Sequence, residues 1–191
     1  SGRILVDGVD IRKIKLHDLR QRIGYVPQKG VLFSGTIDSN IRYGKPEATE
    51  AEVKRAAEIA QAWEFIQDKE DGMDSAIAQG GSNVSGGQKQ RLSIARAIAK
   101  EPEIYIFDDS FSALDYKTDV VLRRALKKET KDATTLIVAQ RISTILHADK
   151  ILVLDEGKVV GQGTHKELLK SCDVYRQIAM SQLSEEELAD E

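Results

Sequence analysis

The stretch Asn83-Val-Ser-Gly-Gly-Gln-Lys-Gln-Arg91 places a glycine pair directly before an amphipathic run. Ser85 is a favourable helix N-cap, and apolar residues follow it at helical spacing (Leu92, Ile94, Ala95, Ile98 and Ala99). Two glycines at the start of a helix let backbone N–H groups approach a ligand, and the positive end of the helix dipole favours an anion. The stretch therefore predicts a phosphate-sized anion at Ser85 to Gln88. The alternative is an ordinary capped helix after a glycine turn.

The composition is typical of one globular domain, with 191 residues of which 41% are hydrophobic and 31% charged. The 28 basic and 31 acidic residues are intermixed and give a net charge of −3, so we expect no nucleic-acid partner. The single cysteine, Cys172, excludes an internal disulfide and fits a reducing compartment. Because no apolar run is long enough to span a bilayer and no secretory signal is present, we expect any membrane link to come through another segment or protein.

Apolar runs that predict strands alternate with helical patterns over much of the chain. The predicted strands are residues 23–27, 104–107, 134–139 and 150–154, and helices at 118–128 and 142–147 separate the last three. This order implies βαβ units and a parallel sheet, and we expect the strands at 104–107 and 134–139 to be buried on both faces. Residues 36–100 are predicted to be mainly helical, with a capping box at Thr49 and Glu52. The fold class is therefore α/β with a helical insertion before residue 101.

The C-terminal part contains a glycine-bounded segment and two helical patterns. Residues 157–163 are interpreted as a hairpin, and helices are expected from Lys166 and from Val174. The acidic end, residues 184–191, is expected to be a frayed tail.

Two acids, Asp108 and Asp109, directly follow the predicted strand at 104–107. Open parallel sheets place their ligands at the carboxyl ends of the strands, and Mg²⁺ prefers oxygen ligands while it keeps several waters. Asp108 is therefore the candidate magnesium residue, whereas Asp109 needs the following turn to bring it to the same side. The alternative is that both acids cap the next turn together with Ser110.

Five motifs, in the expected order, resemble those of ATP-binding cassette (ABC) proteins. Val84 to Arg91 is similar to the signature motif, and Ile104-Tyr-Ile-Phe-Asp-Asp109 resembles the Walker B strand. Ser112-Ala-Leu-Asp115 resembles the D-loop and Tyr25-Val-Pro-Gln28 the Q-loop, while Ile137-Val-Ala-Gln-Arg141 occupies the place of the switch-histidine loop. The resemblance covers nearly the whole chain and is highly specific.

The resemblance implies a P-loop NTPase-like parallel sheet flanked by helices, with ATP and Mg²⁺ as cofactors. Its motifs carry over to nucleotide-binding residues Gln28, Ser85, Gly86, Gly87, Gln88 and Asp115, to metal residues Asp108 and Gln28, and to catalytic residues Asp109 and Gln140. It also implies that residues 1–191 are a partial nucleotide-binding domain. Within it, 1–35 and 101–170 would form the α/β core, 36–100 a helical subdomain with the signature motif, and 171–191 a C-terminal helix and tail.

Two further stretches, Phe33 to Ile41 and Gly161 to Leu169, resemble exporter-type cassettes, in particular those of bacterial multidrug exporters. Such a cassette lies at the cytoplasmic face of the cell membrane, where its helical insertion touches the coupling helices of a transmembrane domain. Two cassettes pair head to tail, so each ATP lies between the Walker motifs of one chain and the signature of the other. The anion at Ser85 to Gly87 would then be the γ-phosphate of an ATP held chiefly by the partner.

The sequence departs from the family pattern in three places. No Gly-x-x-x-x-Gly-Lys-Ser/Thr stretch occurs, and the family places this phosphate loop before residue 1, so we expect these residues taken alone neither to bind nor to hydrolyse ATP appreciably. Asp109 stands where the family has the catalytic Glu, and it is one methylene shorter. Gln140 stands where the family has His, and an amide cannot carry a proton near neutral pH.

Asp109 and Gln140 together resemble the degenerate-site half of heterodimeric exporters, in which one of the two ATP sites hydrolyses poorly. The expected partners are therefore a second, different cassette and a transmembrane domain. Two alternatives stay open at this point. One is a soluble ABC ATPase of DNA repair or translation, and the other is a non-catalytic regulatory or dimerisation module.

Overall fold

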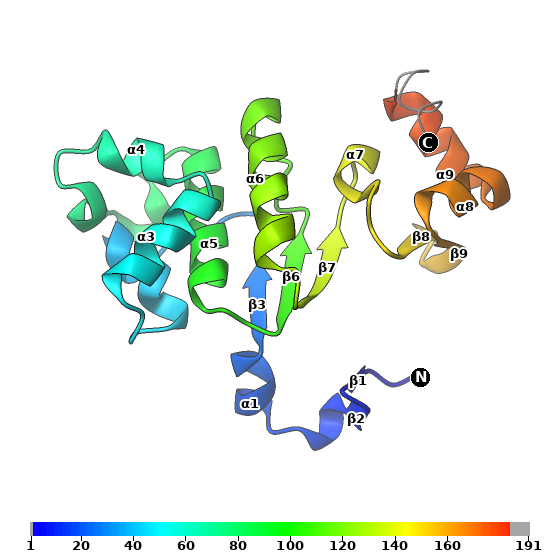
Figure 1. The fold of residues 1–191 in the computed structure, drawn as a ribbon, viewed down its shortest axis with the longest axis horizontal. Helices are drawn as coiled ribbons and strands as arrows, with labels where there is room; N and C mark the ends of the chain where they lie inside the picture. Colours follow the sequence, from blue (N-terminus) through cyan, green and yellow to red (C-terminus); the bar gives the residue numbers. More distant parts are fainter. Residues whose placement is uncertain (1, 184–191) are drawn as a thin grey trace. The chain divides into compact units, whose positions relative to one another are not determined.

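A computed structural model describes residues 2–183 of the chain. They form two compact units, one ending at Val138 and the other beginning at Ala139 (Figure 1). The acidic tail predicted at residues 184–191 lies outside the described residues. Within the described part of the chain, no helix is both long and apolar enough to cross a membrane.

A parallel sheet forms the centre of the first unit, as the sequence predicts. Its strands are β3 (Ile23–Val26), β6 (Ile104–Asp108) and β7 (Thr134–Val138), in the spatial order β3-β6-β7. The register aligns Tyr25 with Ile106, and Ile106 with Leu136. All three strands therefore end at the same edge, and Figure 1 shows their arrowheads pointing the same way.

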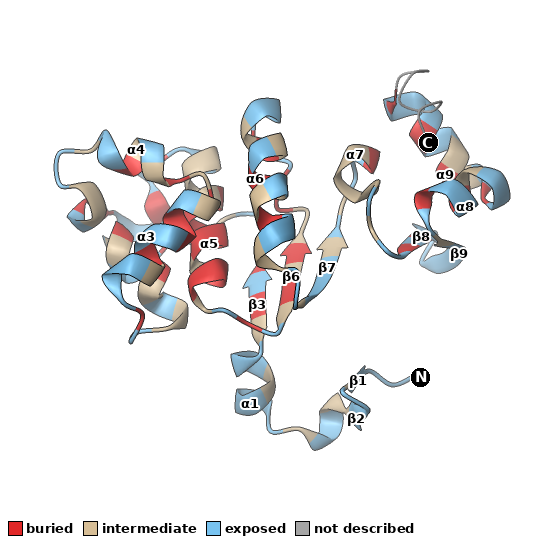
Figure 2. Cartoon of the chain, in the orientation of Figure 1, coloured by how far each residue is buried: buried red, intermediate tan, exposed pale blue. Residues whose placement is uncertain are grey.

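Only one face of this sheet is fully covered. Val26, Tyr105 and Phe107 share a buried core with residues of helix α5 (Gly86–Ala99) and helix α6 (Tyr116–Glu129). On the other face, Leu136 and Val138 are about half exposed, at 54% and 50%. The prediction that the strands at 104–107 and 134–139 are buried on both faces is therefore wrong. The second face of β6 is only partly covered, and Figure 2 shows β7 without buried residues.

Helix α5 packs closely against the sheet, which explains a glycine in β3. A Cβ added to Gly24 would lie 2.7 Å from Cγ of Pro102 and 3.4 Å from the Ala97 carbonyl oxygen, so a larger residue does not fit there without a shift.

The predicted cap of α5 is confirmed, since the Ser85 side chain accepts a hydrogen bond from the Gln88 N–H and the Gln88 side chain accepts one from the Ser85 N–H.

The segment between β3 and β6 is mainly helical, as expected for residues 36–100. The capping boxes at Thr36 with Ser39 and at Thr49 with Glu52 start two of its helices. Its elements are β4 (Gly35–Thr36), α2 (Ile37–Ile41), η2 (Arg42–Gly44), α3 (Glu50–Ile59), α4 (Trp63–Gln67), η3 (Gly72–Asp74), β5 (Ala76–Ile77) and η4 (Gln79–Gly81), followed by α5.

The N-terminal part of the first unit is a small hairpin followed by short helices. Asp7 and Gly8 form its turn with φ values of +49° and +77°, as the Asp-Gly pair favours. The elements are β1 (Leu5–Val6), β2 (Val9–Asp10), η1 (Ile11–Lys13) and α1 (Leu16–Gln21).

The second unit corrects the prediction for the strand at 150–154. Strand β8 (Ile151–Asp155) does not join the parallel sheet but pairs antiparallel with β9 (Lys158–Gly163). Glu156 and Gly157 between them have φ values of +46° and +76°, and a two-residue turn of this kind directs the chain back antiparallel. Residues 157–163 are therefore one arm of a hairpin rather than a whole one. The helices of this unit are α7 (Ile142–Ile145), α8 (His165–Ser171) and α9 (Asp173–Gln182).

An ion cluster around Lys45 ties the helical segment together and yields a pH prediction. The Lys45 ammonium donates to Glu52 and to Glu101, each at 2.7 Å. The bond from Lys45, followed by the bond from the Thr49 N–H, lowers the pKa of Glu52 to about 2 from an ordinary value of 4.5. Because the folded pKa is the lower one, ionised Glu52 contributes stability above pH 4.5 that is lost as the pH falls toward 2.

The substitution Glu52→Gln is expected to lower the melting temperature at pH 7, because it removes one of the two carboxylate charges that Lys45 faces. Glutamine also serves in a capping box, so the cap at Thr49 is kept. Thermal unfolding followed by circular dichroism at pH 7 and at pH 2–3 checks this. The difference between variant and parent should shrink at low pH, and a difference that stays constant with pH would contradict the prediction.

Candidate functional site

The site begins at the carboxyl end of β6, where Asp108 is the last residue of the strand. The next residue, Asp109, has a φ of +45°, a conformation that Asp adopts more readily than most residues. Its N–H donates to the Val138 carbonyl at 2.8 Å, and the fully buried Ser110 hydroxyl donates to the Val26 carbonyl at 2.8 Å. The loop after β6 is therefore fastened to the ends of both neighbouring strands.

Gln28 reaches this loop from the end of β3. Its side-chain amide donates to Oδ2 of Asp109 at 2.9 Å. The structure thus brings together two residues that the sequence assigns to one site although they are far apart in the chain. The Gln28 amide N–H holds the Asp109 carboxylate in one orientation. The Gln28 side-chain oxygen stays available to accept a hydrogen bond or to bind a metal ion.

Tyr25 also reaches the site, and the sequence-based reasoning did not single it out. Its hydroxyl donates to Oδ2 of Asp108 at 3.1 Å, and this bond to a carboxylate raises the pKa of Tyr25. The register between β3 and β6 places Tyr25 beside Ile106, on the face that carries Asp108. Finding this contact from the sequence would have required the register.

The donors at this edge fit a magnesium ion that arrives with a nucleotide. Asp108, Asp109 and Gln28 offer carboxylate and amide oxygens, which Mg²⁺ prefers. Among residues 2–183, no group of three or more His, Cys, Asp or Glu side chains is arranged to hold a metal ion. Protein sites for Mg²⁺ commonly use one or two carboxylates, with waters and substrate phosphates supplying the other ligands. The donor set therefore suits a metal–phosphate complex better than a free ion.

The glycine pair forms the first turn of α5. The Gln88 N–H donates to the Ser85 hydroxyl oxygen at 3.2 Å, and the Ser85 N–H donates to Oε1 of Gln88 at 3.0 Å. The preceding N–H groups, those of Gly86 and Gly87, have no acceptor within a helix. A Cβ added to Gly86 would meet nothing within 4 Å, so a ligand can approach the backbone closely there.

Three contacts hold the first turn of α5 next to other motifs. The buried Gln90 side chain donates to the Pro27 carbonyl at 3.0 Å, directly before Gln28. A Cβ added to Gly30 would lie 2.8 Å from the Lys89 carbonyl oxygen, so the Gln28 loop and α5 touch through their backbones. On the other side, a Cβ at Gly87 would lie 3.6 Å from the Ala113 carbonyl oxygen.

Asp115 and Gln140 are placed differently from the residues above. Asp115 caps α6 by accepting a hydrogen bond from the Thr118 N–H at 3.0 Å, and this bond lowers the pKa of Asp115. Gln140 belongs to the second unit, where its carbonyl accepts a hydrogen bond from the Gln182 side chain at 3.0 Å. Its role as the switch residue stays a prediction.

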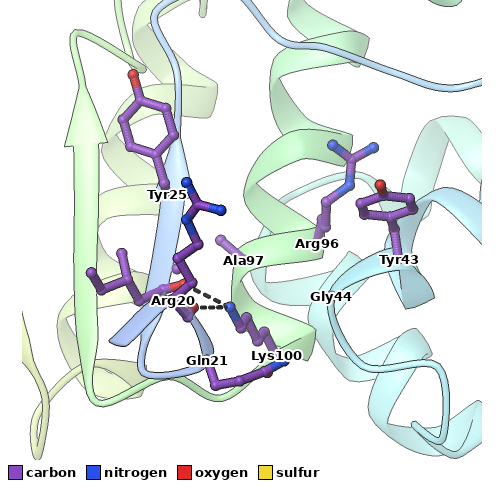
Figure 3. A pocket seen from close by; sticks show the side chains of 10 residues that line it. Arg20, Gln21, Tyr25, Tyr43, Gly44, Arg96, Ala97 and Lys100 are labelled. Atoms are coloured by element: carbon purple, nitrogen blue, oxygen red, sulfur yellow. Dashed lines mark hydrogen bonds between the residues drawn. The ribbon is translucent and has the colours of Figure 1, made fainter. Parts of the chain in front are cut away.

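A pocket of about 390 Å³ opens between β3, η2 and α5 (Figure 3). The Lys100 ammonium donates to the carbonyl oxygens of Arg20 at 2.6 Å and Ile23 at 2.8 Å. The Arg96 guanidinium lies 5.1 Å from the centre of the Phe33 ring and 5.6 Å from that of Tyr43. Burial lowers the pKa of both Arg96 and Lys100. The pocket is therefore lined by basic and aromatic side chains.

A profile of the ABC transporter family matches residues 1–112. The chain belongs to the ABC transporter family. An ABC transporter ATP-binding protein of Mycobacterium tuberculosis is 48% identical over 95% of this chain and 31% of its own length. A putative multidrug export ATP-binding/permease protein of Staphylococcus aureus is 46% identical over 93% of this chain and 31% of its own length.

A solved structure extends the match to the fold. The ATP-bound structure of a bacterial Atm1-family ABC exporter superposes with a TM-score of 0.93 and 41% identity, over 97% of this chain and 33% of that one. The fold is therefore the α/β fold of ABC ATPases, with a parallel sheet flanked by helices. The chain spans about a third of the length of the relatives that it matches.

The substitution Gly86→Ala is expected to leave the fold intact or to raise its free energy of unfolding by up to about 1 kcal/mol, since glycine is a poor helix former. The structure has room for the added methyl group. Denaturant-induced unfolding measures the change. Gly24→Ala is the matched control, because its Cβ would collide with Pro102, and it should destabilise the protein. A Gly86→Ala variant as unstable as Gly24→Ala would contradict the prediction.

Proposed function

We propose that this chain is the ATP-binding motor domain of an ABC exporter, located at the cytoplasmic face of a bacterial membrane. The observation that carries the proposal is the likeness to an ATP-bound exporter, at a TM-score of 0.93 and 41% identity over 97% of the chain. The relative in Staphylococcus aureus is named as a multidrug export protein, which supports the same direction of transport. The inactivity predicted for residues 1–191 taken alone stays a prediction.

Gln28, Ser85, Gly86, Gly87, Gln88 and Asp115 are the proposed nucleotide-binding residues. A bound Mg²⁺ would neutralise charge on the ATP phosphates, and Asp108 with Gln28 would hold it. The first turn of α5 presents backbone N–H groups and a helix dipole to the γ-phosphate of an ATP bound mainly by a second cassette. In the capping box the Ser85 hydroxyl oxygen and the Gln88 amide oxygen act only as acceptors, so the Ser85 O–H and the Gln88 NH₂ can donate to the anion together with the glycine N–H groups.

The chain's own ATP site is proposed to be the weaker of two in a heterodimer. Asp109 is the acid placed to take a proton from the attacking water, but its side chain is short and its carboxylate is held by Gln28 at 2.9 Å. General-base help depends on hydrogen-bond reach and is typically worth about 10²–10⁴-fold. Gln140 can donate a hydrogen bond to a phosphate oxygen but cannot carry a proton there.

The pocket beside β3 is proposed to lie on the surface that contacts the transmembrane domain. Arg20 and Tyr43 stand at this pocket, and the aromatic rings around Arg96 offer an apolar platform beside positive charge. The segment from Phe33 to Ile41 that resembles exporters leads directly into it. An acidic and apolar segment of the transmembrane domain is the partner that this chemistry fits.

A non-catalytic regulatory module is the second candidate. The presence of both Asp109 and Gln140, where the family has Glu and His, favours it. A cassette without hydrolysis of its own would still present its glycine turn to a partner. A soluble ABC ATPase has less support, because residues 33–41 and 161–169 both resemble exporters.

Replacing Asp109 and Gln140 by the family residues Glu and His tests the proposal in the complete transporter. With the partner's catalytic acid disabled, Asp109→Glu together with Gln140→His should raise ATP turnover at this chain's site, on the order of tenfold to a hundredfold. The backbone at Asp109 has a positive φ, which Glu adopts less readily, so the gain should stay below the full value of a general base.

The control is Asp109→Asn with Gln140→His, which has the new histidine but no acid. Unchanged hydrolysis in the Asp109→Glu, Gln140→His variant, with ATP binding intact, would contradict the assignment of these two residues. Hydrolysis in the parent that already equals the partner's site would contradict the weak-site proposal itself.

A further inference from the structure

Tyr25 lies at a position from which few side chains could touch Asp108. On β3, Tyr25 pairs in register with Ile106 of β6. Ile106 is two residues before Asp108, so Tyr25, Ile106 and Asp108 share one face of the sheet. The two Cα atoms are therefore separated by roughly 8 Å, from the strand rise and spacing. A long and rigid side chain spans this distance, and Figure 3 shows the Tyr25 ring extending along the sheet in the direction in which the strands run.

The contact differs from an ordinary packing contact of a core tyrosine. The side chain of Tyr25 is 54% exposed, whereas its hydroxyl donates to Oδ2 of Asp108 at 3.1 Å. On the other side of β6, the register places Val138 beside Asp108, and valine offers no donor. The phenol is thus the side-chain donor that reaches this carboxylate from the neighbouring strands.

The chemistry of the donor matters for a residue that meets a cation. A lysine or arginine at position 25 would neutralise Asp108 and compete with Mg²⁺. A neutral hydroxyl fixes the orientation of the carboxylate while leaving its negative charge in place. It uses Oδ2 and leaves Oδ1 for the cation or for a water that the cation holds.

We propose that Tyr25 is a positioning residue for magnesium, whose hydroxyl holds the Asp108 carboxylate in the orientation that receives the metal of a bound nucleotide. The inference rests on the proposed function, in which Asp108 takes part in holding MgATP. Hydrogen-bond partners of metal-ligating carboxylates typically contribute 10–100-fold to metal affinity. Because Tyr25 is half exposed, the expected effect is at the lower end, about tenfold.

The test measures metal binding directly in the complete protein, with Mn²⁺ as the probe and a non-hydrolysable ATP analogue present. Electron paramagnetic resonance of free Mn²⁺ gives the affinity of each class of site. Asp108→Asn identifies the class that belongs to this chain, since it should remove that class. Tyr25→Phe, which deletes only the hydroxyl, should weaken the same class about tenfold.

Tyr105→Phe is the matched control. Tyr105 lies on β6, the strand that carries Asp108, but on the opposite face of the sheet from Asp108 and Tyr25, so loss of its hydroxyl should leave Mn²⁺ binding unchanged. Equal effects of Tyr25→Phe and Tyr105→Phe would overturn the inference, since they would reflect a general change in the sheet. Unchanged or tighter binding in Tyr25→Phe would overturn it too.

The two variants separate the role of Tyr25 from the metal role of Asp108. If Asp108→Asn removes a class of Mn²⁺ sites and Tyr25→Phe leaves that class as it was, the role of Tyr25 is wrong and the proposed function stands. If Asp108→Asn leaves Mn²⁺ binding intact, the proposed metal role of Asp108 is wrong, and the inference falls with it.

Discussion

The parallel pairing of β3 with β6 is the interaction on which the candidate site depends. It brings the end of β3, with Tyr25 and then Gln28, beside the end of β6, with Asp108 and Asp109. The hydrogen bonds from Tyr25 to Asp108 and from Gln28 to Asp109 follow from this register. A shift of one residue would turn Tyr25 to the other face and separate these pairs.

Helix α5 adds the second constraint. It packs against β3 at Gly24 and is bonded to Pro27 through the buried side chain of Gln90, while its backbone touches Gly30. The same helix begins with the glycine turn at Ser85 to Gly87. A single packed unit therefore carries both the residues that would act on the chain's own nucleotide and the turn that would act on the nucleotide of a partner. A displacement of the Gln28 loop would have to move the glycine turn with it.

Local signals in the sequence predicted the local structure well. The capping box at Thr49 and the N-cap at Ser85 are confirmed, and the strands predicted at 23–27 and 104–107 are observed within one residue of those bounds. The motifs also predicted that Gln28 and Asp109 share a site. The pairing of the strand at 150–154 was predicted wrongly although its signal, the two-residue turn at Glu156 and Gly157, is local. The exposure of Leu136 was beyond the sequence, because the covering of a sheet face is set by long-range packing. Tyr25 was missed for the same reason, since an alternating pattern gives the face of a residue but not its register.

The central claim is that the glycine turn of this chain works on a nucleotide bound by another subunit. The most direct measurement is ATP hydrolysis at the partner's site in the assembled transporter, with Gly86→Ala in this chain and the partner left unchanged. The account predicts a loss on the order of a hundredfold, because the added methyl group takes the space through which the phosphate approaches the backbone N–H groups, and losing a donor that stabilises transition-state charge typically costs about that much. Asp109→Asn in this chain should leave the partner's site active. Full hydrolysis at the partner's site in the Gly86→Ala transporter would contradict it.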